Sequence, residues 1–418
     1  MATSRSRSYR GAAVCFLCAG SGQLWLTFCR LQRPPHTSAG HRFSPSLSRA
    51  VVRCLDPGRF EVAPEWLSEG QIIMSTPLDV CPGSLQVSSH RASSMEGLPP
   101  GFPSGTDQEW RVLRFQPPEG ESRLIQSVTK VCLPPGAPAG SAVQRGDCLP
   151  LLFMKSIVST MLAALVLVRS TGAPADLKRA AQDLKEAPLR ILVIGLGGGA
   201  LSTYLSHNLP GSHVDVAELE PAVLRAASEA MGFVQSDRLR AVLGDGAALA
   251  LDATKDGLTS DAWPGAYDAV LLDVCDPLGG VPAAFIDPNG DFPRALSAGL
   301  LRKRGGILAM NLLPRYDPAP ALAAFRGALC EAAKAAGGGI HPGMTFFVRE
   351  PGRLLDGQAA PGTGNFILIQ ASGGPDIDSL ESLRASIGQA AVEVQHVLNS
   401  PFDMASLAGG TSETWPFD

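Results

Sequence analysis

Acidic residues follow successive apolar runs in this sequence, and the first run leads into a glycine-rich turn. Residues 191–194 are continuously apolar, and Gly195-Leu-Gly-Gly-Gly199 comes directly after them. Glycine lets the chain turn sharply and lets a ligand approach bare backbone. The next run, 214–217, predicts a second buried strand and leads to Glu218, whose carboxylate can accept hydrogen bonds from both hydroxyls of a ribose. The spacing predicts a nucleoside-binding strand-helix-strand unit, and GxGGG in place of GxGxxG makes a dinucleotide the less expected ligand.

Two further acids end later apolar runs. The run 239–243 is followed by Gly244-Asp245-Gly246, and the run 267–272 is followed by Asp273. The carboxyl ends of neighbouring parallel strands line one crevice of a doubly wound sheet, so we expect these acids near Glu218. A carboxylate at the end of a buried strand is costly without a partner, which favours a site role for Asp273.

Strands and helices alternate through the rest of the chain, which predicts an α/β fold built on a doubly wound parallel sheet. The later elements expected, in chain order, are a helix at 292–301, a strand at 307–312, a helix at 319–336 and strands at 344–348 and 366–370. The last two strands can form the antiparallel pair that often completes such a sheet. Upstream, 110–115 and 123–132 alternate polar and apolar residues around a turn, which predicts a small N-terminal β-hairpin extension.

The predicted organisation has five parts. They are a transit peptide or unstructured leader at 1–55, a linker of low order at 56–108, a hairpin and helix extension at 109–172, the main α/β domain at 173–372, and a C-terminal helix and tail at 373–418. The leader is predicted because its residues include eight Arg and no Lys, Asp or Glu. Since the whole chain carries −4 and this segment +8, the remainder carries −12, which argues against nucleic acid as a partner.

Neither a membrane span nor a metal site is expected. Residues 149–168 are apolar enough to be scored as a membrane helix, but Lys155 and three hydroxyl side chains favour a buried helix packed on the sheet. Cys15 and Cys18 form a lone CxxC pair, without a second pair or a histidine cluster at zinc spacing.

Several short motifs of this sequence recur, in order, in a known family. They are LIQS at 124–127, GLGGG at 195–199, VDVAELEP at 214–221, MGFVQSDRL at 231–239, GDG at 244–246, YDAVLLDV at 267–274 and MNLLPR at 310–315. Together they resemble the C-terminal catalytic domain of the elongation factor 1-alpha lysine and N-terminal methyltransferase (methyltransferase-like 13) family. That family belongs to the class I S-adenosylmethionine-dependent methyltransferases, close in fold to the polyamine synthases. The resemblance implies a seven-stranded, Rossmann-like class I methyltransferase sheet.

The resemblance also implies which residues bind S-adenosylmethionine. The implied contacts are Gly195, Gly197 and Gly199 beside the methionine part, Glu218 with the adjoining Leu219 at the ribose, Asp245 at the adenine amino group, Gly246 near the adenine ring and Asp273 at the transfer site. No metal ligand is implied.

Methyl transfer to an amine asks the protein mainly for alignment and for removal of one proton. A sulfonium methyl group is already a good electrophile, so the site has to bring a lone pair in line with it and exclude water. A lysine or terminal amine must arrive neutral, and Asp273 with Asp276 could orient it and take up its proton. Asp276 could equally be a turn residue before Pro277. Asn311, at the end of the fifth strand, could add an amide contact to the acceptor.

Two other functions stay open. The loop 273–280 reads DVCDPLGG, which resembles the DSSDPxGP loop of spermidine synthases and keeps a polyamine aminopropyltransferase as an alternative. Those synthases carry an aspartate within the glycine turn, whereas Ala200 follows Gly199 here. The second alternative is a catalytically silent methyltransferase-like fold that serves as a binding module.

The expected partner is a protein substrate, for which the resemblance suggests a translation elongation factor. No nucleic-acid or membrane partner is expected, and a homodimer is compatible with the sequence. Residues 1–108 are too short and too poor in strand pattern for a second methyltransferase domain, so one catalytic unit is expected. The expected location is the cytoplasm, or a mitochondrion or plastid if the leader is a transit peptide.

Overall fold

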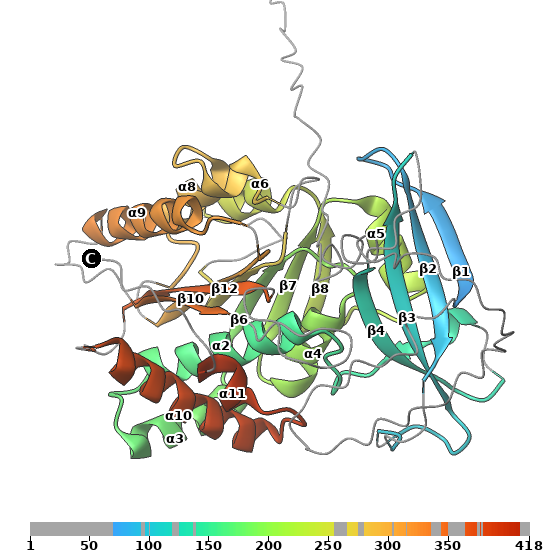
Figure 1. The fold of residues 1–418 in the computed structure, drawn as a ribbon, viewed down its shortest axis with the longest axis horizontal. Coiled ribbons are helices and arrows are strands. Elements are labelled where there is room, and N and C mark those ends of the chain that lie inside the picture. Colours follow the sequence, from blue (N-terminus) through green and yellow to red (C-terminus); the bar gives the residue numbers. More distant parts are fainter. Residues whose placement is uncertain are drawn as a thin grey trace, which may run out of the picture.

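Two β-sheets, one of them covered by helices, make up the part of the chain that the computed structural model describes (Figure 1). The described residues are 70–92, 97–99, 101–118, 125–136, 139–254, 266–274, 280–302, 305–314, 316–335, 344–349, 364–373, 377 and 379–409. The predicted leader at 1–55, most of the loop 252–266 and the candidate acid Asp276 lie outside the described residues.

The seven-stranded sheet, sheet B, has the strand order β11-β12-β10-β9-β6-β7-β8. Its strands are β6 Arg190–Ile194, β7 His213–Glu218, β8 Leu239–Leu243, β9 Ala269–Leu272, β10 Gly306–Leu312, β11 Thr345–Arg349 and β12 Phe366–Ser372. The first five run parallel, and β12 is antiparallel to both of its neighbours. The predicted doubly wound seven-stranded sheet, with an antiparallel pair at its end, is confirmed. Strand order reverses beside β6, and sheets of this kind bind ligands at such a switch point.

Helices cover both faces of sheet B because its strands are apolar on both sides. In β6, Ile191 and Val193 pack into one core cluster, and Leu192 and Ile194 pack into the other. The first cluster includes residues of α2 Leu152–Val168, α3 Pro174–Glu186, α4 Ala200–Asn208, α10 Leu380–Leu398 and α11 Met404–Gly409. The second includes residues of α6 Gly246–Asp252, α7 Ala283–Ile286, α8 Asp291–Ser297 and α9 Ala319–Ala335. Figure 1 shows α6, α8 and α9 on one face and α2, α3, α10 and α11 on the other.

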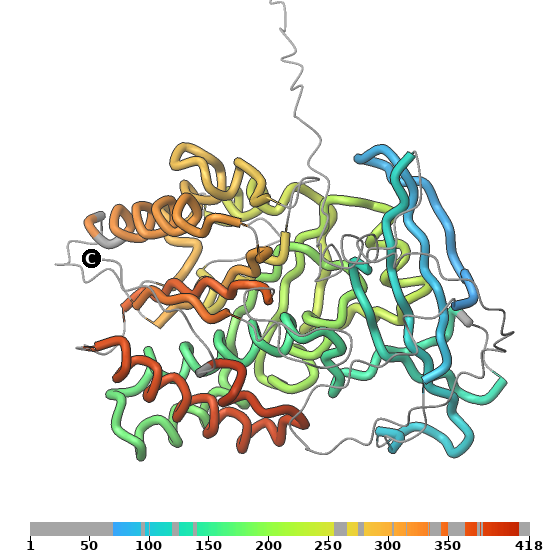
Figure 2. Tube along the Cα trace, viewed as in Figure 1, coloured from blue at the N-terminus to red at the C-terminus, as the bar shows by residue number. Residues whose placement is uncertain are grey.

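Helix α2 is the apolar segment that could have been taken for a membrane span. Its residues from Ile157 to Leu167 are all buried, and it packs against α10 and α11 from the C-terminal end of the described chain (Figure 2). The predicted buried helix is therefore confirmed. Within the described residues, the structure has no helix with the length and apolar character needed to span a membrane.

The five-stranded sheet, sheet A, corrects the prediction for the N-terminal region. Its antiparallel strands, in spatial order, are β1 Gln71–Pro77, β2 Ser84–Arg91, β3 Asp107–Gln116, β4 Ile125–Leu133 and β5 Val143–Gln144. The predicted hairpin is the β3–β4 pair at its centre, but the linker of low order expected at 56–108 is wrong for 71–91. Serine and glutamine occupy one face of β2, while Leu85 and Val87 on the other face are fully buried. The alternation of polar and apolar residues in β2 is short, and the surrounding residues are mostly polar, so it did not indicate a strand.

Candidate active site

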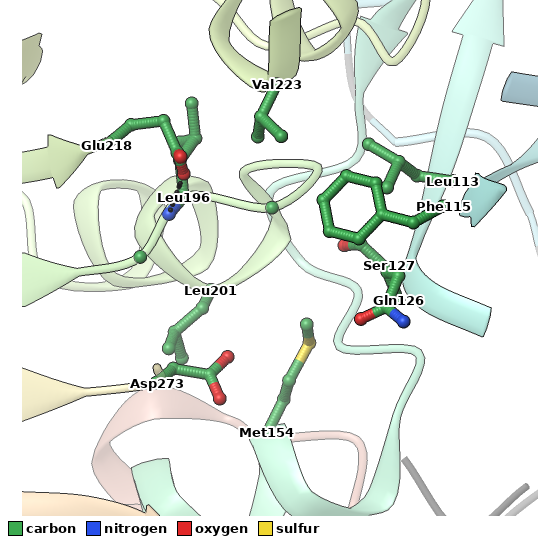
Figure 3. A pocket seen from close by; sticks show the side chains of 12 residues that line it. Leu113, Phe115, Gln126, Ser127, Met154, Leu196, Leu201, Glu218, Val223 and Asp273 are labelled. Atoms are coloured by element: carbon green, nitrogen blue, oxygen red, sulfur yellow. Dashed lines mark hydrogen bonds between the residues drawn. The ribbon is translucent and has the colours of Figure 1, made fainter. Parts of the chain in front are cut away.

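A pocket lies outside the carboxyl ends of β6, β7 and β9, beside the switch point of sheet B (Figure 3). Its lining residues are Leu113, Phe115, Gln126, Ser127, Met154, Gly195, Leu196, Gly197, Leu201, Glu218, Val223 and Asp273. It is open to solvent, and the space between its lining atoms, open solvent included, is about 530 Å³. The pocket brings together Glu218, Asp273 and the start of the glycine turn, which are far apart in sequence.

The glycine turn presents main chain to this pocket. Gly195 has a φ of 100°, and a Cβ atom there would lie 2.4 Å from the carbonyl oxygen of Asp273. Any larger residue would therefore force β6 and β9 apart at their ends. Gly197 also has a positive φ, 54°, and lines the pocket. Gly199 caps α4 and is outside the lining, because it packs against the ring of Phe233.

Glu218 is held in the pocket by backbone N–H groups. Its side chain is nearly fully buried, Oε2 accepts a hydrogen bond from the N–H of Leu196 at 3.0 Å, and Oε1 accepts one from the N–H of Glu220 at 2.8 Å. Burial raises the pKa of Glu218 to about 7, and the N–H groups of Glu220 and Leu196 oppose that rise. A carboxylate in this environment is stabilised by further donors, and the two hydroxyls of a ribose can supply them.

Asp273, directly after β9, is held by the side-chain amide of Asn311 from β10, which is in turn held by Asn365, the residue before β12. Asn311 donates from Nδ2 to Oδ1 of Asp273 at 2.9 Å, and Asn365 donates from Nδ2 to Oδ1 of Asn311 at 3.0 Å. A carboxylate only accepts hydrogen bonds, so the amide nitrogen of Asn311 must face it and the amide oxygen must face Asn365. Asn311 thus holds the side chain of Asp273 in this structure. The sequence predicted a contact of Asn311 with the acceptor and did not predict this hydrogen bond. Asn365 was not singled out in the sequence, and no local pattern marks it.

Sheet A forms the opposite wall of the pocket, which sequence reasoning missed. Leu113 and Phe115 come from β3, and Gln126 and Ser127 come from β4 (Figure 3). Ser127 Oγ accepts a hydrogen bond from the N–H of Gly198 at 2.9 Å, which fastens the glycine turn to this wall. The LIQS motif contains both polar residues, so a signal was present in the sequence.

Gln126 has an unusual environment on this wall. Its side chain is 93% buried (7% exposed), and neither its amide nitrogen nor its amide oxygen has a hydrogen-bond partner among the described residues. Buried polar atoms normally have partners, and one left without them points to a ligand. Gln126 lines the pocket, so its amide can both donate to and accept from a molecule bound there.

Three other predicted ligand residues lie outside the pocket lining. Asp245 is exposed, and its Oδ1 accepts from the N–H of Ala247 at 2.9 Å as the N-cap of α6. Gly246 is packed against Ile194, and Leu219 is half-buried. Their contacts with an adenine or ribose stay predictions. Among the described residues, no group of three or more His, Cys, Asp or Glu side chains could hold a metal ion.

Chemically, the pocket offers one buried carboxylate, Glu218, at one end and a second acid, Asp273, at the other. Glu218 and the main chain of the glycine turn form the first end, and Asp273 with its amide support forms the second (Figure 3). Apolar side chains from β3, α2 and α4 contribute the apolar part of the pocket lining. The arrangement suits a molecule that carries a ribose at one end and a reactive centre at the other.

Comparisons with known proteins bear on the family resemblance. No family model matches the chain. Curated relatives named eEF1A lysine and N-terminal methyltransferase are 39% identical over 111 residues in Mus musculus and 34% identical over 137 residues in Homo sapiens. These segments cover 25% and 32% of this chain but only 15% and 18% of the two relatives. The resemblance that the motifs indicate is confirmed, although this chain matches less than one fifth of each relative's length.

Aminopropyltransferases are also similar to this chain. Polyamine aminopropyltransferase 2 of Hyperthermus butylicus is 28% identical over 138 residues, which cover 32% of this chain and 41% of that protein. Among solved structures, human Methyltransferase-like protein 13 in complex with SAH is 24% identical, covers 60% of this chain and 93% of that chain, and has a TM-score of 0.41. A probable spermidine synthase from Corynebacterium glutamicum is 18% identical, covers 71% and 94%, and has a TM-score of 0.39.

Proposed function

We propose that this chain is an S-adenosylmethionine-dependent methyltransferase that transfers a methyl group to a protein amine, a lysine side chain or an N-terminus. The observation that carries the proposal is the pocket at the switch point of sheet B. It gathers a glycine turn, the buried carboxylate of Glu218 and the carboxylate of Asp273 from three separate strand ends. Across the sheet, Glu218 on β7, the glycine turn after β6 and Asp273 after β9 come from neighbouring strands. A ligand with a ribose at Glu218 and a reactive centre at Asp273 would follow this order.

The residues present fit S-adenosylmethionine. Glu218 would accept hydrogen bonds from the ribose hydroxyls, and the unpartnered amide of Gln126 would contact polar atoms of the ligand. When bound, S-adenosylmethionine supplies an electrophilic methyl group on a positively charged sulfur. The chain's own task is to orient the amine towards it and keep water out, which is catalysis by proximity.

Asp273 is the residue we assign to the amine. Its Oδ1 accepts a hydrogen bond from Asn311, which gives the carboxylate a defined orientation at the carboxyl end of β9. An alkylammonium has no lone pair, so Asp273 would accept one proton from it, and the neutral nitrogen would then be able to attack. A role for Asp276 in orienting the amine stays a prediction from the sequence.

The acceptor and the wider biology are proposals drawn from the relatives. Relatives that carry the name eEF1A lysine and N-terminal methyltransferase support a protein acceptor, and a translation elongation factor is the first candidate to test. A homodimer and a location in the cytoplasm, or in an organelle if the leader directs it there, also stay predictions.

An aminopropyltransferase is the second candidate, supported by the similarity to Polyamine aminopropyltransferase 2. The two functions need different donors, because an aminopropyltransferase uses the decarboxylated form of S-adenosylmethionine. Calorimetric titration of the purified chain with both forms separates them. We expect the carboxylated form to bind at least tenfold more tightly, which is about 1.4 kcal/mol. Preference for the decarboxylated form would favour the synthase, and binding of neither would favour a silent module.

Transfer itself is tested with tritium-labelled S-adenosylmethionine and a cell lysate as the source of acceptors. We expect label in protein with the wild-type chain, and mass spectrometry of the labelled band to place the methyl group on an amine. The same reaction with putrescine and labelled decarboxylated donor is the matched test of the alternative. Label in a polyamine and none in protein would overturn the proposal.

A further inference from the structure

Glu220, two residues after Glu218, joins sheet A to the nucleoside end of the pocket. Its side chain is only 3% exposed. Oε1 accepts a hydrogen bond from the N–H of Asp79 at 2.8 Å, and Oε2 accepts one from the N–H of Val80 at 2.9 Å. Asp79 and Val80 lie in the loop between β1 and β2, about 140 residues earlier in the sequence. A buried carboxylate therefore links two segments that are distant in the sequence.

The same residue reaches Glu218 through its main chain. The N–H of Glu220 donates to Oε1 of Glu218 at 2.8 Å, while Glu218 Oε2 accepts from the N–H of Leu196 in the glycine turn. One continuous set of hydrogen bonds thus runs from the β1–β2 loop, through the side chain and then the main chain of Glu220, to Glu218.

Capping of α5 accounts for only part of this arrangement. Glu220 is the N-cap of α5 Pro221–Glu229, and its Oε1 accepts from the N–H of Ala222 at 3.2 Å. The shorter Asp, Asn, Ser and Thr side chains are the usual residues at this position. The extra methylene of glutamate is what allows the carboxylate to reach the β1–β2 loop as well.

We infer that Glu220 is a positioning residue of the nucleoside site, through which docking of the β1–β2 loop fixes the orientation of Glu218. The inference rests on the proposed function for its ligand, S-adenosylmethionine. Because linkage is reciprocal, loop docking strengthens ligand binding by the same factor by which the ligand strengthens loop docking. Sheet A then lines the binding site and also orients Glu218 through its β1–β2 loop.

The test compares Glu220→Asp with Arg225→Ala in the full chain. Aspartate keeps a carboxylate for the α5 cap but is too short to hold both loop amides. Arg225 forms an ion pair of 2.9 Å with the Asp79 side chain, and both side chains are more than 40% exposed, so its removal perturbs the same loop without touching the buried carboxylate. Calorimetry with S-adenosylmethionine is run at a temperature where circular dichroism shows each variant folded.

We expect Glu220→Asp to weaken S-adenosylmethionine binding about tenfold and Arg225→Ala to change it less than twofold. Hydrogen exchange should be faster at the Asp79, Val80 and Leu196 amides in Glu220→Asp, and added ligand should slow exchange at Asp79 and Val80 in the wild type. Wild-type affinity in Glu220→Asp would overturn the inference and leave Glu220 as a cap only.

The exchange measurement also separates this inference from the proposed function. If the wild-type chain binds no S-adenosylmethionine, the proposed function fails, but the link from Glu220 to Glu218 is still read at the Leu196 amide, which donates to Glu218. Faster exchange there in Glu220→Asp, without ligand, would support the positioning role. Unchanged exchange at Leu196 would overturn it.

Discussion

The two acids of the pocket are held by different kinds of groups. Glu218 receives its hydrogen bonds from the main-chain N–H groups of Leu196 and Glu220, and it is nearly fully buried. Asp273 is half-buried and receives a hydrogen bond from the side-chain amide of Asn311. The first acid is therefore fixed by the path of the backbone, and the second by the identities of neighbouring side chains.

This difference separates binding from reaction. Main-chain donors persist as long as the backbone around them keeps its path, so the ligand end should tolerate nearby substitutions that leave that path unchanged. Side-chain donors are removed by single substitutions, so the reaction end can be altered while the ligand end stays intact. We therefore expect variants at the Asp273 end to change the rate of transfer and variants at Glu218 to change affinity.

Asp273→Ala should give the largest effect. The substitution removes the group that we assign to orienting the amine and accepting its proton, and such groups contribute roughly 10²–10⁴-fold to rate. We expect tritium transfer to fall about 10³-fold, while calorimetry shows S-adenosylmethionine binding within threefold of wild type. Asp287→Ala, on the surface between α7 and α8, is the control for loss of a carboxylate. Equal labelling by Asp273→Ala and wild type would remove Asp273 from the mechanism.

Glu218→Gln should reverse this pattern. The amide keeps the shape of the side chain but loses the charge, and its NH₂ group faces one of the two N–H donors. A hydrogen bond to a charged group is worth about 1.5–3 kcal/mol, so we expect affinity for S-adenosylmethionine to fall about 30-fold. The rate at saturating donor should change less than threefold. Glu229→Gln, at the exposed end of α5, is the matched control, and a loss of rate without a loss of affinity would contradict the comparison.

The ligand end should also depend on pH. Glu218 has a pKa of about 7, raised by burial, so it is largely protonated at pH 6 and ionised at pH 8. Ribose hydroxyls donate to the ionised form, and binding should therefore strengthen about tenfold as the pH rises over this range. 5′-Deoxy-5′-methylthioadenosine is the ligand to titrate, since it has the ribose but no amino acid group of its own. The pH dependence of affinity should disappear in Glu218→Gln. If affinity still rises with pH in that variant, a group other than Glu218 causes the dependence.

The same contrast explains what the sequence could predict. The strands of sheet B are apolar on both faces and end in Glu218 and Asp273, so local pattern was enough to find the sheet and to place both acids at one edge. Sheet A was underestimated because β2 has serine and glutamine on one face and only a short apolar face. The roles of Gln126 and Ser127 depend on how β4 docks on the glycine turn, and this long-range packing leaves no periodic trace in the sequence.

Asn365 is the clearest case of a residue that only the register of strands brings to the site. It precedes β12, whose first residue, Phe366, pairs with Leu312 of β10, and this pairing places its amide beside Asn311. Nothing near Asn365 in the sequence indicates a partner more than fifty residues away. The reaction end therefore depends on the antiparallel pairing of β10 with β12. The sequence predicted an antiparallel pair of β11 with β12 only, so neither this pairing nor the contact of Asn365 with Asn311 was predicted.

Asn365→Leu should give the smallest of these effects and the sharpest test of the comparison. Leucine removes the donor to Asn311 Oδ1, so the Asn311 amide is free to turn its oxygen towards Asp273 and disturb the carboxylate. We expect transfer to slow about fivefold, which corresponds to about 1 kcal/mol, with S-adenosylmethionine affinity unchanged. Asn208→Leu removes a comparable amide at the far end of α4, where Nδ2 donates to carbonyls of Gly146 and Tyr204, and should lower stability without slowing transfer. An Asn365→Leu variant that loses as much affinity for S-adenosylmethionine as it loses transfer rate would contradict the comparison. A side-chain change at the Asp273 end would then affect the main-chain donors around Glu218, and the two ends of the pocket would not be supported separately.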